Sequence, residues 1–386
     1  MRGWVVAQDT DIPLAGATVI ADHETTIADD QAWFELKKPT TKIIISYVGY
    51  QTDTLMITDI QKNHQIFLKP EIQLTESIVV SAQLNQYPIE RMPSSIGYIG
   101  ELQEQNQNVI NFVGNLNQIP GVFAQTGTYN TNRITIRGMG SRTPYGTNRI
   151  KAYYNDIPLT TGDGSTEIED ISASSIGSVK ILKGSKSALY GSGLGGTIIL
   201  NKPTYKNGFH VEAQANLASF NTYKALAAAQ YSKNGFYIGS DYNRAQSAGW
   251  RENSQYKRDH FTLNTGFVST KSLFDVTLLA IKTNAQIPSS LNQDDFKYSP
   301  ESAAQNWLNV KGFEKYNKLI LGLKYQYHFS DKLQNATNLF FLLSDAYESR
   351  PFNILKDASN KWGLRNITSL QLSKLKIQLG FEGLFE

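Results

Sequence analysis

Residues 206–386 alternate apolar and polar side chains with a period of two, in runs of about ten residues, the length of a membrane-crossing strand. In residues 209–217 every odd position is apolar and every even position is polar, and the alternation returns in residues 318–329 and 375–382. Because successive side chains of a strand point to opposite faces, each run has one apolar and one polar face. A transmembrane β-barrel has this pattern, with lipid outside and a wet or filled lumen inside, although a soluble sandwich alternates too.

The spacing of these runs separates the two alternatives better than the alternation does. Nine candidate strands leave eight links: residues 219–221, 232–235, 245–256, 269–272, 285–314, 330–331, 347–361 and 373–374. After the first, the links alternate short and long, as do the short periplasmic turns and longer extracellular loops of outer-membrane barrels. Residues 285–314 form the longest link, which is either a large surface loop or a disordered insertion.

Four segments upstream of the strands carry a family resemblance. They are Ile134–Gly138 (ITIRG), Tyr153–Leu159 (YYNDIPL), Ile176–Gly184 (IGSVKILKG) and Ser187–Asn201 (SALYGSGLGGTIILN). Their order and spacing resemble the plug of a TonB-dependent outer-membrane receptor of the siderophore or ferric-citrate type. The resemblance implies a mainly β chain with an α+β plug domain at residues 93–205. Residues 206–386 would be the N-terminal, truncated part of a 22-stranded antiparallel transmembrane β-barrel.

The glycine-rich stretch Gly191–Gly196 formally matches the dinucleotide-binding pattern GxGxxG. That fingerprint requires a helix after the glycines. Residues 197–200 read Thr-Ile-Ile-Leu, which predicts a strand instead. We therefore reject a dinucleotide site and expect the glycines to permit a tight turn and a close approach of backbone to the barrel wall.

Residues 1–69 contain short β-rich runs such as Ala17–Ala21 and Lys42–Tyr47, separated by turn residues. This spacing predicts a small β-sandwich. The pieces at 13–19, 32–34 and 46–51 resemble the carboxypeptidase-regulatory-like domain, a name that implies no peptidase activity. An unrelated immunoglobulin-like domain is the alternative.

Residues 70–92 form a linker with a β-prone stretch. In the receptor family this position holds the TonB box, which implies that TonB binds Glu76, Ser77, Ile78, Val79, Val80, Ser81 and Ala82. An extended peptide can add a strand to a partner's sheet edge through main-chain hydrogen bonds, so its side chains need only favour β-structure. The alternative is a plain linker strand that packs on the sandwich.

The resemblance also implies two kinds of site in the plug. Arg137 and Lys183 would hold the plug in place by pairing with barrel carboxylates, which the sequence does not identify; a bidentate guanidinium–carboxylate pair suits such a lock. Two polar loops would face outside and bind the ligand. Their candidate residues are Gln125, Thr126, Tyr129, Asn130, Thr161, Asp163, Ser165 and Thr166.

Composition excludes several other functions. A net charge of +3 is too small to support nucleic-acid binding, and the absence of cysteine removes disulfides and thiolate chemistry. The five histidines are scattered, without HExxH spacing, and no nucleophile elbow appears, so we expect neither an enzyme nor a bound metal or cofactor. Residues 1–6 show no signal-peptide pattern, and we expect a fragment that lacks its signal peptide and the second half of the barrel.

The resemblance implies TonB-dependent active import of a scarce ligand, a ferric siderophore or ferric citrate, across the outer membrane of a Gram-negative bacterium. The N-terminal domain would be periplasmic. The partners would be TonB with its inner-membrane energising complex, the iron chelate and outer-membrane lipid. Cobalamin, haem or a glycan remain alternative ligands, and a non-transporting surface-binding β protein is a further alternative.

Overall fold

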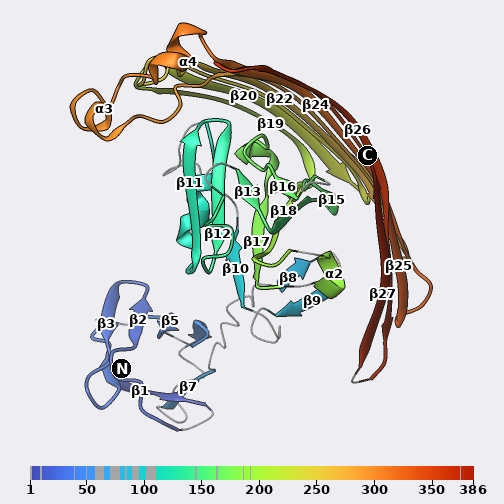
Figure 1. Ribbon diagram of the computed structural model, residues 1–386. Helices are drawn as coiled ribbons and strands as arrows, with labels where there is room; N and C mark the ends of the chain where they lie inside the picture. Colours follow the sequence, from blue (N-terminus) through green and yellow to red (C-terminus); the bar gives the residue numbers. More distant parts are fainter. Residues whose placement is uncertain are drawn as a thin grey trace. The chain divides into compact units, whose positions relative to one another are not determined.

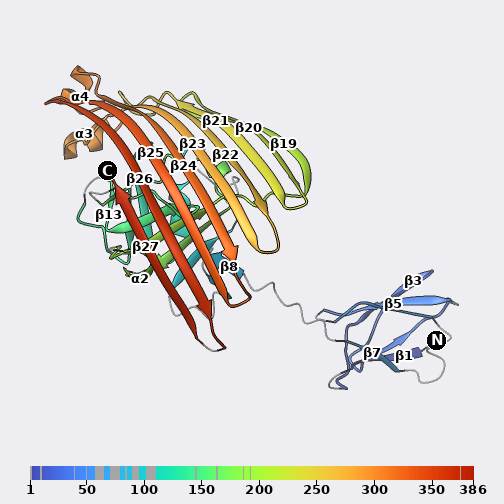
Figure 2. The ribbon, with the colours of Figure 1, turned by 90° about the vertical axis from the view of Figure 1, so that its right-hand side faces the viewer.

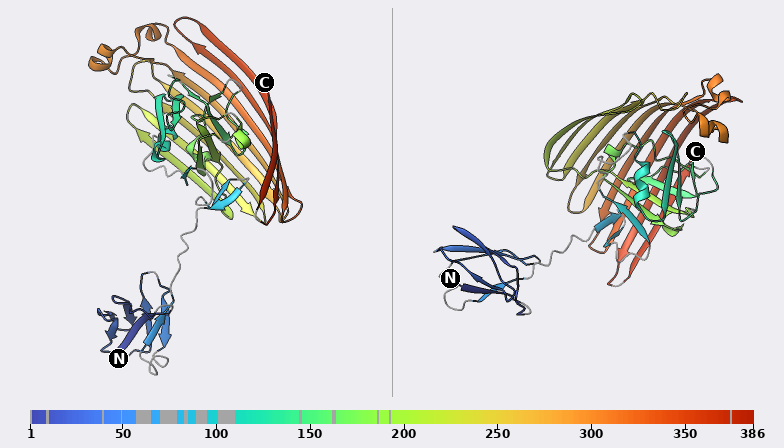
Figure 3. Two further views of the ribbon diagram at one scale, coloured as in Figure 1. Left: turned by 60° about the horizontal axis from the view of Figure 1, so that its bottom comes forward. Right: turned by 90° about the vertical axis from the view of Figure 1, so that its left-hand side faces the viewer.

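The computed structural model divides the chain into two compact units, Met1–Met92 and Pro93–Glu386, shown in Figures 1, 2 and 3. The residues it describes are 2–8, 11–38, 40–48, 50–56, 65–69, 79–82, 85–88, 95–100, 110–143, 146–161, 164–185, 187–191, 193–373 and 375–386. Among these residues, no helix has both the length and the apolar character needed to cross a membrane.

The first unit contains a β-sandwich. Its strands are β1 (Arg2–Ala7), β2 (Thr18–Ala21), β3 (Glu24–Ile27), β4 (Trp33–Glu35), β5 (Lys42–Ser46), β6 (Asp53–Met56) and β7 (Gln65–Leu68). In the described part, β4-β1-β7 form one sheet and β3-β2-β5-β6 form another. The two sheets share a core, into which β5 turns Ile43 and Ile45 and β4 turns Phe34. The kinship of this sandwich with the carboxypeptidase-regulatory-like domain stays a prediction.

The structure describes part of the predicted TonB box. Glu76, Ser77 and Ile78 fall outside the described residues. The backbone of the remaining four forms strand β8 (Val79–Ala82), which pairs in antiparallel register with β9 (Asn85–Pro88). This stretch therefore adopts extended backbone and takes part in strand pairing.

The second unit begins with a small domain that we call the inner domain, residues 95–206. Its elements are β10 (Ile96–Ile99), η3 (Val113–Gln118), β11 (Val122–Thr128), β12 (Thr131–Ile136), β13 (Thr147–Asn148), β14 (Ile150–Tyr154), β15 (Ile157–Pro158), β16 (Ser165–Thr166), η4 (Ala173–Ser175), β17 (Ser178–Lys183), α2 (Ser187–Tyr190) and β18 (Gly196–Asn201). Among them, β10-β17-β18-β14-β15 form a mixed sheet in which β14 and β18 are parallel. The β11–β12 hairpin and the 3-10 helix η3 pack beside this sheet.

The strand predicted after the glycine-rich stretch is confirmed, because β18 begins at Gly196 and no helix follows the glycines. Gly196 has φ +146°, and a Cβ there would collide with the carbonyl oxygen of Leu182 on the paired strand β17. Only glycine fits this close backbone approach without strain.

The remaining residues form a large antiparallel sheet that we call the wall. Its strands are β19 (Gly208–Ala218), β20 (Thr222–Lys233), β21 (Phe236–Ser247), β22 (Tyr256–Val268), β23 (Ser272–Gln286), β24 (Phe313–His328), β25 (Leu333–Ser349), β26 (Ile354–Gln371) and β27 (Lys376–Phe385). Each strand pairs with the next along the chain, so the described residues give the nine strands that the alternation predicts. Figure 1 shows this sheet curving past one side of the inner domain.

The links between wall strands agree with the prediction except at one place. Residues 248–255 and 287–312 are long links, and the second carries helices α3 (Gln293–Tyr298) and α4 (Gln305–Asn309) instead of being a disordered insertion. The predicted long link at 347–361 is wrong. There, β25 continues to Ser349 and β26 starts at Ile354, in full register. Residues 354–360 have polar side chains on both faces, so their sequence lacks the alternation of period two. Their backbone nevertheless continues the hydrogen-bonded ladder with β25.

The two faces of the wall differ as the alternation predicts. Many outward side chains are apolar and exposed, for example Val211 at 70% and Leu217 at 86%. Near the short links, an outward aromatic belt includes Tyr325, Tyr327 and Phe329, whose rings contact one another in sequence. Inward positions carry the buried polar side chains of the wall, such as Asn243, Thr262 and Thr277, together with some buried apolar ones.

The core of the inner domain extends into the wall. Leu279 of β23, Ile320 of β24 and Phe340 of β25 belong to the same buried cluster as the inner domain's own apolar side chains. Between them, a Cβ at Gly322 would collide with the side chain of Ile157. The inner domain thus rests directly on a small-residue position of the wall.

Candidate functional site

Ion pairs join the inner domain to the wall, and in the described residues most of them have the cation on the wall and the carboxylate on the inner domain. The pair between Lys202 of the inner domain and Asp275 of β23 has the opposite sense. Four wall cations, buried or half-buried, contact carboxylates or backbone carbonyls of the inner domain. The cations are Arg258, Lys318, Lys324 and Arg365. A set of charge-assisted contacts in a partly dry interface can hold two domains together and still separate when one partner changes.

The densest contact involves β24 and the segment before η4. Lys318 Nζ lies 2.6 Å from Asp170 Oδ2 and also pairs with Glu167. Tyr316 lies two residues before Lys318 on the same face of β24, and its hydroxyl donates a hydrogen bond to Asp170. Burial alone would raise the pKa of Asp170, but the Lys318 charge and these hydrogen bonds keep it below its ordinary value. The aspartate is therefore anionic at neutral pH.

The neighbouring glutamate behaves in the opposite way. Glu169 is buried, and burial, followed by the charges of Asp170 and Glu167, raises its pKa to about 8. Its main-chain oxygen accepts a hydrogen bond of 2.8 Å from Arg258 Nη1, while Arg258 Nη2 donates to Ile110 O at 3.0 Å. Near neutral pH the Glu169 carboxyl holds its proton, and it can lose it in a mildly alkaline environment.

A second contact is made by the tight turn between β14 and β15. Asn155 and Asp156 both have positive φ, at +48° and +68°, which Asn and Asp tolerate better than other side chains. The turn places Asp156 Oδ2 2.7 Å from Lys324 Nζ. It also lets Asn155 Nδ2 donate to Thr277 Oγ1 at 3.2 Å. The turn thereby attaches one end of the mixed sheet to β23 and β24.

Arg365 of β26 reaches the glycine-rich end of the inner domain. Its Nη2 donates to Leu189 O at 2.9 Å, and its Nη1 pairs with Glu382 of the adjacent strand β27. The guanidinium carbon lies 5.0 Å from the ring centres of both Tyr153 and Tyr190. Arginine suits this place because its planar fork serves a carboxylate, a carbonyl and two aromatic faces together.

A wall carboxylate completes the interface through hydroxyl groups. Asp241 of β21 accepts hydrogen bonds from Ser174 Oγ at 3.0 Å and from Ser175 Oγ at 3.1 Å. Ser175 Oγ also lies 2.7 Å from Thr262 Oγ1 on β22. The 3-10 turn η4 is therefore fixed to the wall without an ion pair.

A cavity of about 280 Å³ lies next to the Lys318 cluster, between the inner domain and the inward face of the wall. Thr161, Glu167 and Asp170 line it from the inner domain. The wall contributes several charged groups to it, namely Glu314, Lys318, Glu348, Arg350, Asp357 and Lys361. Within the described residues, no cluster of His, Cys, Asp or Glu has a geometry that could hold a metal ion. The cavity suits a polar ligand held by side-chain hydrogen bonds.

The predicted plug lock has other surroundings in the structure. Arg137 is exposed in a turn with φ +52°, and its backbone N–H donates to Gly121 O at 2.7 Å. Lys183 Nζ donates to Pro120 O at 2.6 Å, inside the inner domain. Neither residue pairs with a wall carboxylate among the described residues. Their role as a lock stays a prediction, while the wall cations supply the ion pairs that the structure does contain.

The predicted ligand residues fall into separate places. Thr161 lines the cavity. Gln125 and Thr126 are exposed on the β11–β12 hairpin. Asp163 lies outside the described residues.

The other four predicted ligand residues make structural contacts. Asn130 donates to Glu314 at 2.6 Å, and the Tyr129 ring packs on Tyr256 at 5.2 Å, so this hairpin tip lies at the end of the wall that carries the long links. Thr166 is buried and donates to Ile150 O, and Ser165 O accepts from Thr161. As ligand contacts, all eight residues remain predictions.

Sequence reasoning missed the wall cations as partners. Lys318 and Lys324 occupy polar positions of an alternating strand. The sequence pattern of such a strand is the same whether its polar side chains face water or a protein domain in the lumen. The sequence signal was an inward lysine among larger apolar side chains of the same face, as at Lys318 between Tyr316 and Ile320. Its partner, Asp170, lies 148 residues earlier in the chain.

Comparison with known proteins identifies the inner domain. The sequence profile of the TonB-dependent Receptor Plug Domain matches residues 88–197. The inner domain is a TonB-dependent receptor plug. Among solved structures, the fold is similar to the unliganded ferric citrate transporter FecA, with a TM-score of 0.64 and 18% identity over 76% of this chain. It is also similar to the ferric yersiniabactin uptake receptor FyuA from Yersinia pestis, with a TM-score of 0.62 and 13% identity over 75% of this chain.

A third similar structure is the siderophore receptor PiuA from Acinetobacter baumannii, with a TM-score of 0.58 and 16% identity over 77% of this chain. This chain covers 47% of FecA, 48% of FyuA and 46% of PiuA, about half the length of each. Identities this low establish the fold alone. In that fold, the plug packs against the inward face of antiparallel barrel strands, which is the arrangement of the inner domain and the wall here.

Proposed function

We propose that this protein is a TonB-dependent importer of the outer membrane, a transporter and not an enzyme, with its N-terminal sandwich in the periplasm. The observation that carries the proposal is the plug itself, matched at residues 88–197 and attached to the wall by a set of ion pairs and hydrogen bonds. A protein that only binds ligands at the cell surface has no need of a plug domain held by separable contacts.

The polar interface suggests how the plug would move. The oxygens of a ligand bound beside Thr161, Glu167 and Asp170 would compete with these two carboxylates for Lys318, and a change there would bias the plug between two arrangements. TonB, driven by its inner-membrane complex, would pair with the extended segment 76–82 and pull. Separation of the wall cations from the plug carboxylates would then open a path.

For the ligand, we propose a ferric siderophore or ferric citrate. The polar, hydroxyl- and carboxylate-lined cavity suits a hydrophilic chelate, and structures for ferric citrate and ferric yersiniabactin uptake share the fold. Cobalamin, haem or a glycan are the competing ligands. Growth of a knockout strain on defined iron, haem, cobalamin and glycan sources distinguishes them; a defect on glycan or cobalamin alone would overturn the iron assignment.

The TonB step is tested by removing the strand while retaining the chain length. Replacement of residues 76–82 by a seven-residue Gly-Ser stretch should leave ligand binding to cells unchanged and abolish uptake. A finer pair is Val79→Pro, which removes a backbone N–H, against Val79→Thr, which retains β-propensity. Uptake should fail in the first and persist in the second. Uptake that survives the Gly-Ser replacement contradicts the assignment of the TonB box.

A further inference from the structure

Three lysines meet on the outward face of the wall. Lys257 of β22 and Lys315 of β24 both lie directly opposite Asn284 of β23, one on each side. Lys282 is two residues before Asn284 on the same strand and therefore on the same face. All four side chains are exposed. We call Lys257, Lys282 and Lys315 the lysine triangle.

Within the part of the chain that the structure describes, none of these lysines forms a salt bridge. The closest carboxylate in register is Asp259, opposite Lys282, but it already accepts a 2.6 Å hydrogen bond from Tyr242 and pairs with Arg244 at 3.5 Å. A second carboxylate, Asp345, lies opposite Asn317. Lys315 Nζ lies 4.9 Å from the ring centre of Tyr347. The triangle thus retains an excess of positive charge.

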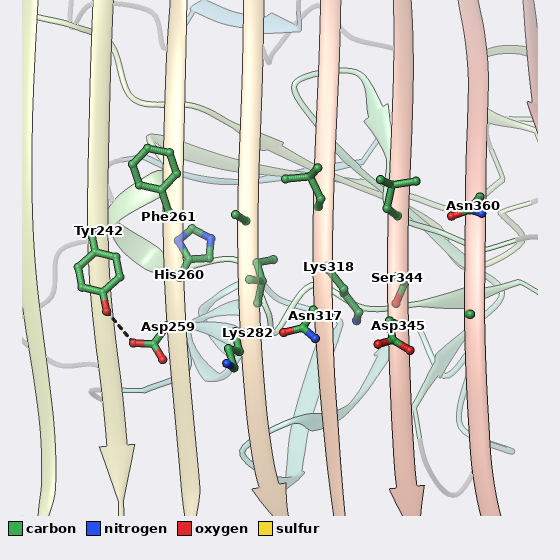
Figure 4. A pocket seen from close by; sticks show the side chains of 15 residues that line it. Tyr242, Asp259, His260, Phe261, Lys282, Asn317, Lys318, Ser344, Asp345 and Asn360 are labelled. Carbon is green, nitrogen blue, oxygen red and sulfur yellow. Dashed lines mark hydrogen bonds between the residues drawn. The ribbon is translucent and has the colours of Figure 1, made fainter.

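Directly beside the triangle, the outward surface is hollowed into a groove of about 620 Å³. Its floor is apolar because Ala280 lies between the larger Phe261 and Leu319 in one row across three strands. Figure 4 shows Asp259, Lys282, Asn317 and Asp345 on adjacent strands along the polar side of the groove. The groove therefore joins an apolar floor to a charged margin.

This combination has a physical requirement. Lys282 is a diagonal neighbour of both Lys257 and Lys315, at about 7 Å between Cβ atoms, and those two lie two strand spacings, about 10 Å, apart. The three ammonium groups therefore share a small area and repel one another. An anion with several oxygens relieves that repulsion. On a surface that faces hydrocarbon, an anion attached to acyl chains satisfies both the triangle and the groove, whereas a free anion satisfies only the triangle.

We propose that the lysine triangle and the adjacent groove bind a phosphorylated glycolipid of the outer leaflet, with its phosphate among the three lysines and an acyl chain along the Phe261–Ala280–Leu319 floor. The triangle lies at the end of the wall with the long links, which the proposed function places outside the cell. The inference rests on that orientation and on the outward face meeting lipid, and not on ligand uptake.

The test uses the protein purified from outer membranes in detergent. Diphosphoryl lipid A is the probe, titrated by native mass spectrometry or by tryptophan quenching. The triple variant Lys257→Gln, Lys282→Gln, Lys315→Gln should bind it on the order of 100-fold more weakly than the parent, on the scale of basic residues at anionic membrane surfaces. Dephosphorylated lipid A should bind the parent and this variant equally weakly.

A matched control has the same loss of charge elsewhere. Lys233, Lys271 and Lys332 are exposed near the short links, and their triple Gln variant should retain parental affinity. Equal weakening in both triple variants would show a general charge effect and overturn the site. Inorganic phosphate that competes as well as the lipid, phosphatidylglycerol that binds as tightly as lipid A, or a dimer in place of lipid binding would each overturn the proposed occupant.

The groove is tested separately. Ala280→Phe fills the floor without touching the inward face, so it should weaken lipid A binding about tenfold and leave ligand binding unchanged. Ala229→Phe, an outward alanine on β20 away from the groove, should change nothing. Lipid affinity unaffected by Ala280→Phe contradicts the acyl-chain placement. Because lipid binding is read on purified protein, failure here is distinct from failure of uptake.

Discussion

The N-terminal sandwich and the plug solve the problem of burying a core in different ways. The sandwich closes its core with its own two sheets, and every side chain of its buried cluster comes from residues 5–68. The plug instead shares its core with the wall through Leu279, Ile320 and Phe340. The sandwich therefore owes its stability to its own residues, whereas the stability of the plug depends on the wall on which it packs.

The largest expected effect comes from a wall side chain in the plug core. Phe340 is fully buried, so Phe340→Ala should cost about 4 kcal/mol, the usual loss for a truncated core phenylalanine. Calorimetry in detergent should show the loss in the transition of the plug and wall and leave the sandwich transition in place. Phe34→Ala, 3% exposed in the sandwich, should do the reverse. A sandwich transition that moves with Phe340→Ala contradicts the independence of the two units.

A smaller effect is expected from the ion pairs. Lys318→Met leaves Glu167 and Asp170 without their cation in a confined place, and breaking such a pair costs about 3 kcal/mol. In the sandwich, Arg2 pairs with Glu35 at 3.3 Å on the exposed surface. Arg2→Met should leave the sandwich melting temperature unchanged because solvent screens that pair. Equal shifts in the two units would show that burial does not govern these contacts.

The plug should also weaken as pH rises. The pKa of Glu169 is raised in the folded protein to about 8, above the ordinary value of 4.5, so the folded state binds its proton more tightly than the unfolded state. The stability it supports is therefore complete below about pH 4.5 and is lost as pH rises through 8. Melting between pH 6 and 9 should show a downward shift of a few degrees that Glu169→Gln removes. A parental melting temperature that rises over this range contradicts the buried neutral carboxyl.

Much of this fold could be predicted from local patterns. Alternation identified the wall strands, and the run Thr-Ile-Ile-Leu at residues 197–200 identified the strand β18 after the glycines. The pattern failed at residues 354–360, where polar side chains on both faces concealed continued strand pairing. The hydrogen bonds of a β-ladder join backbone groups and form with many different side chains. The side-chain pattern therefore does not show where such a ladder ends.

The site was harder to predict than the fold. Polar loops of the plug looked like ligand contacts, yet Asn130 and Thr166 are engaged in structural hydrogen bonds. The sequence showed the interface cations only as polar residues on the inward face of their strands, without their partners. Their partners are set by how the plug docks, as with Arg365, whose carbonyl partner Leu189 is 176 residues away in sequence. Contacts between separate elements follow from packing and not from local sequence.

The smallest expected effect gives the sandwich a pH response of opposite sign to that of the plug. Asp22 accepts a 2.7 Å hydrogen bond from Thr40 Oγ1 and a 3.1 Å bond from Thr41 N, and these bonds lower its pKa. Its contribution is present above the ordinary value of 3.8 and is lost as pH falls through the lowered value. Asp22→Asn should therefore flatten the acid limb of sandwich melting between about pH 5 and pH 2 and leave its alkaline limb unchanged. Since Glu169 weakens the plug toward alkali and Asp22 acts on the sandwich only in acid, a titration from pH 6 to pH 9 should lower the plug transition and leave the sandwich transition in place. Movement of both transitions over that range would contradict the separation of their cores.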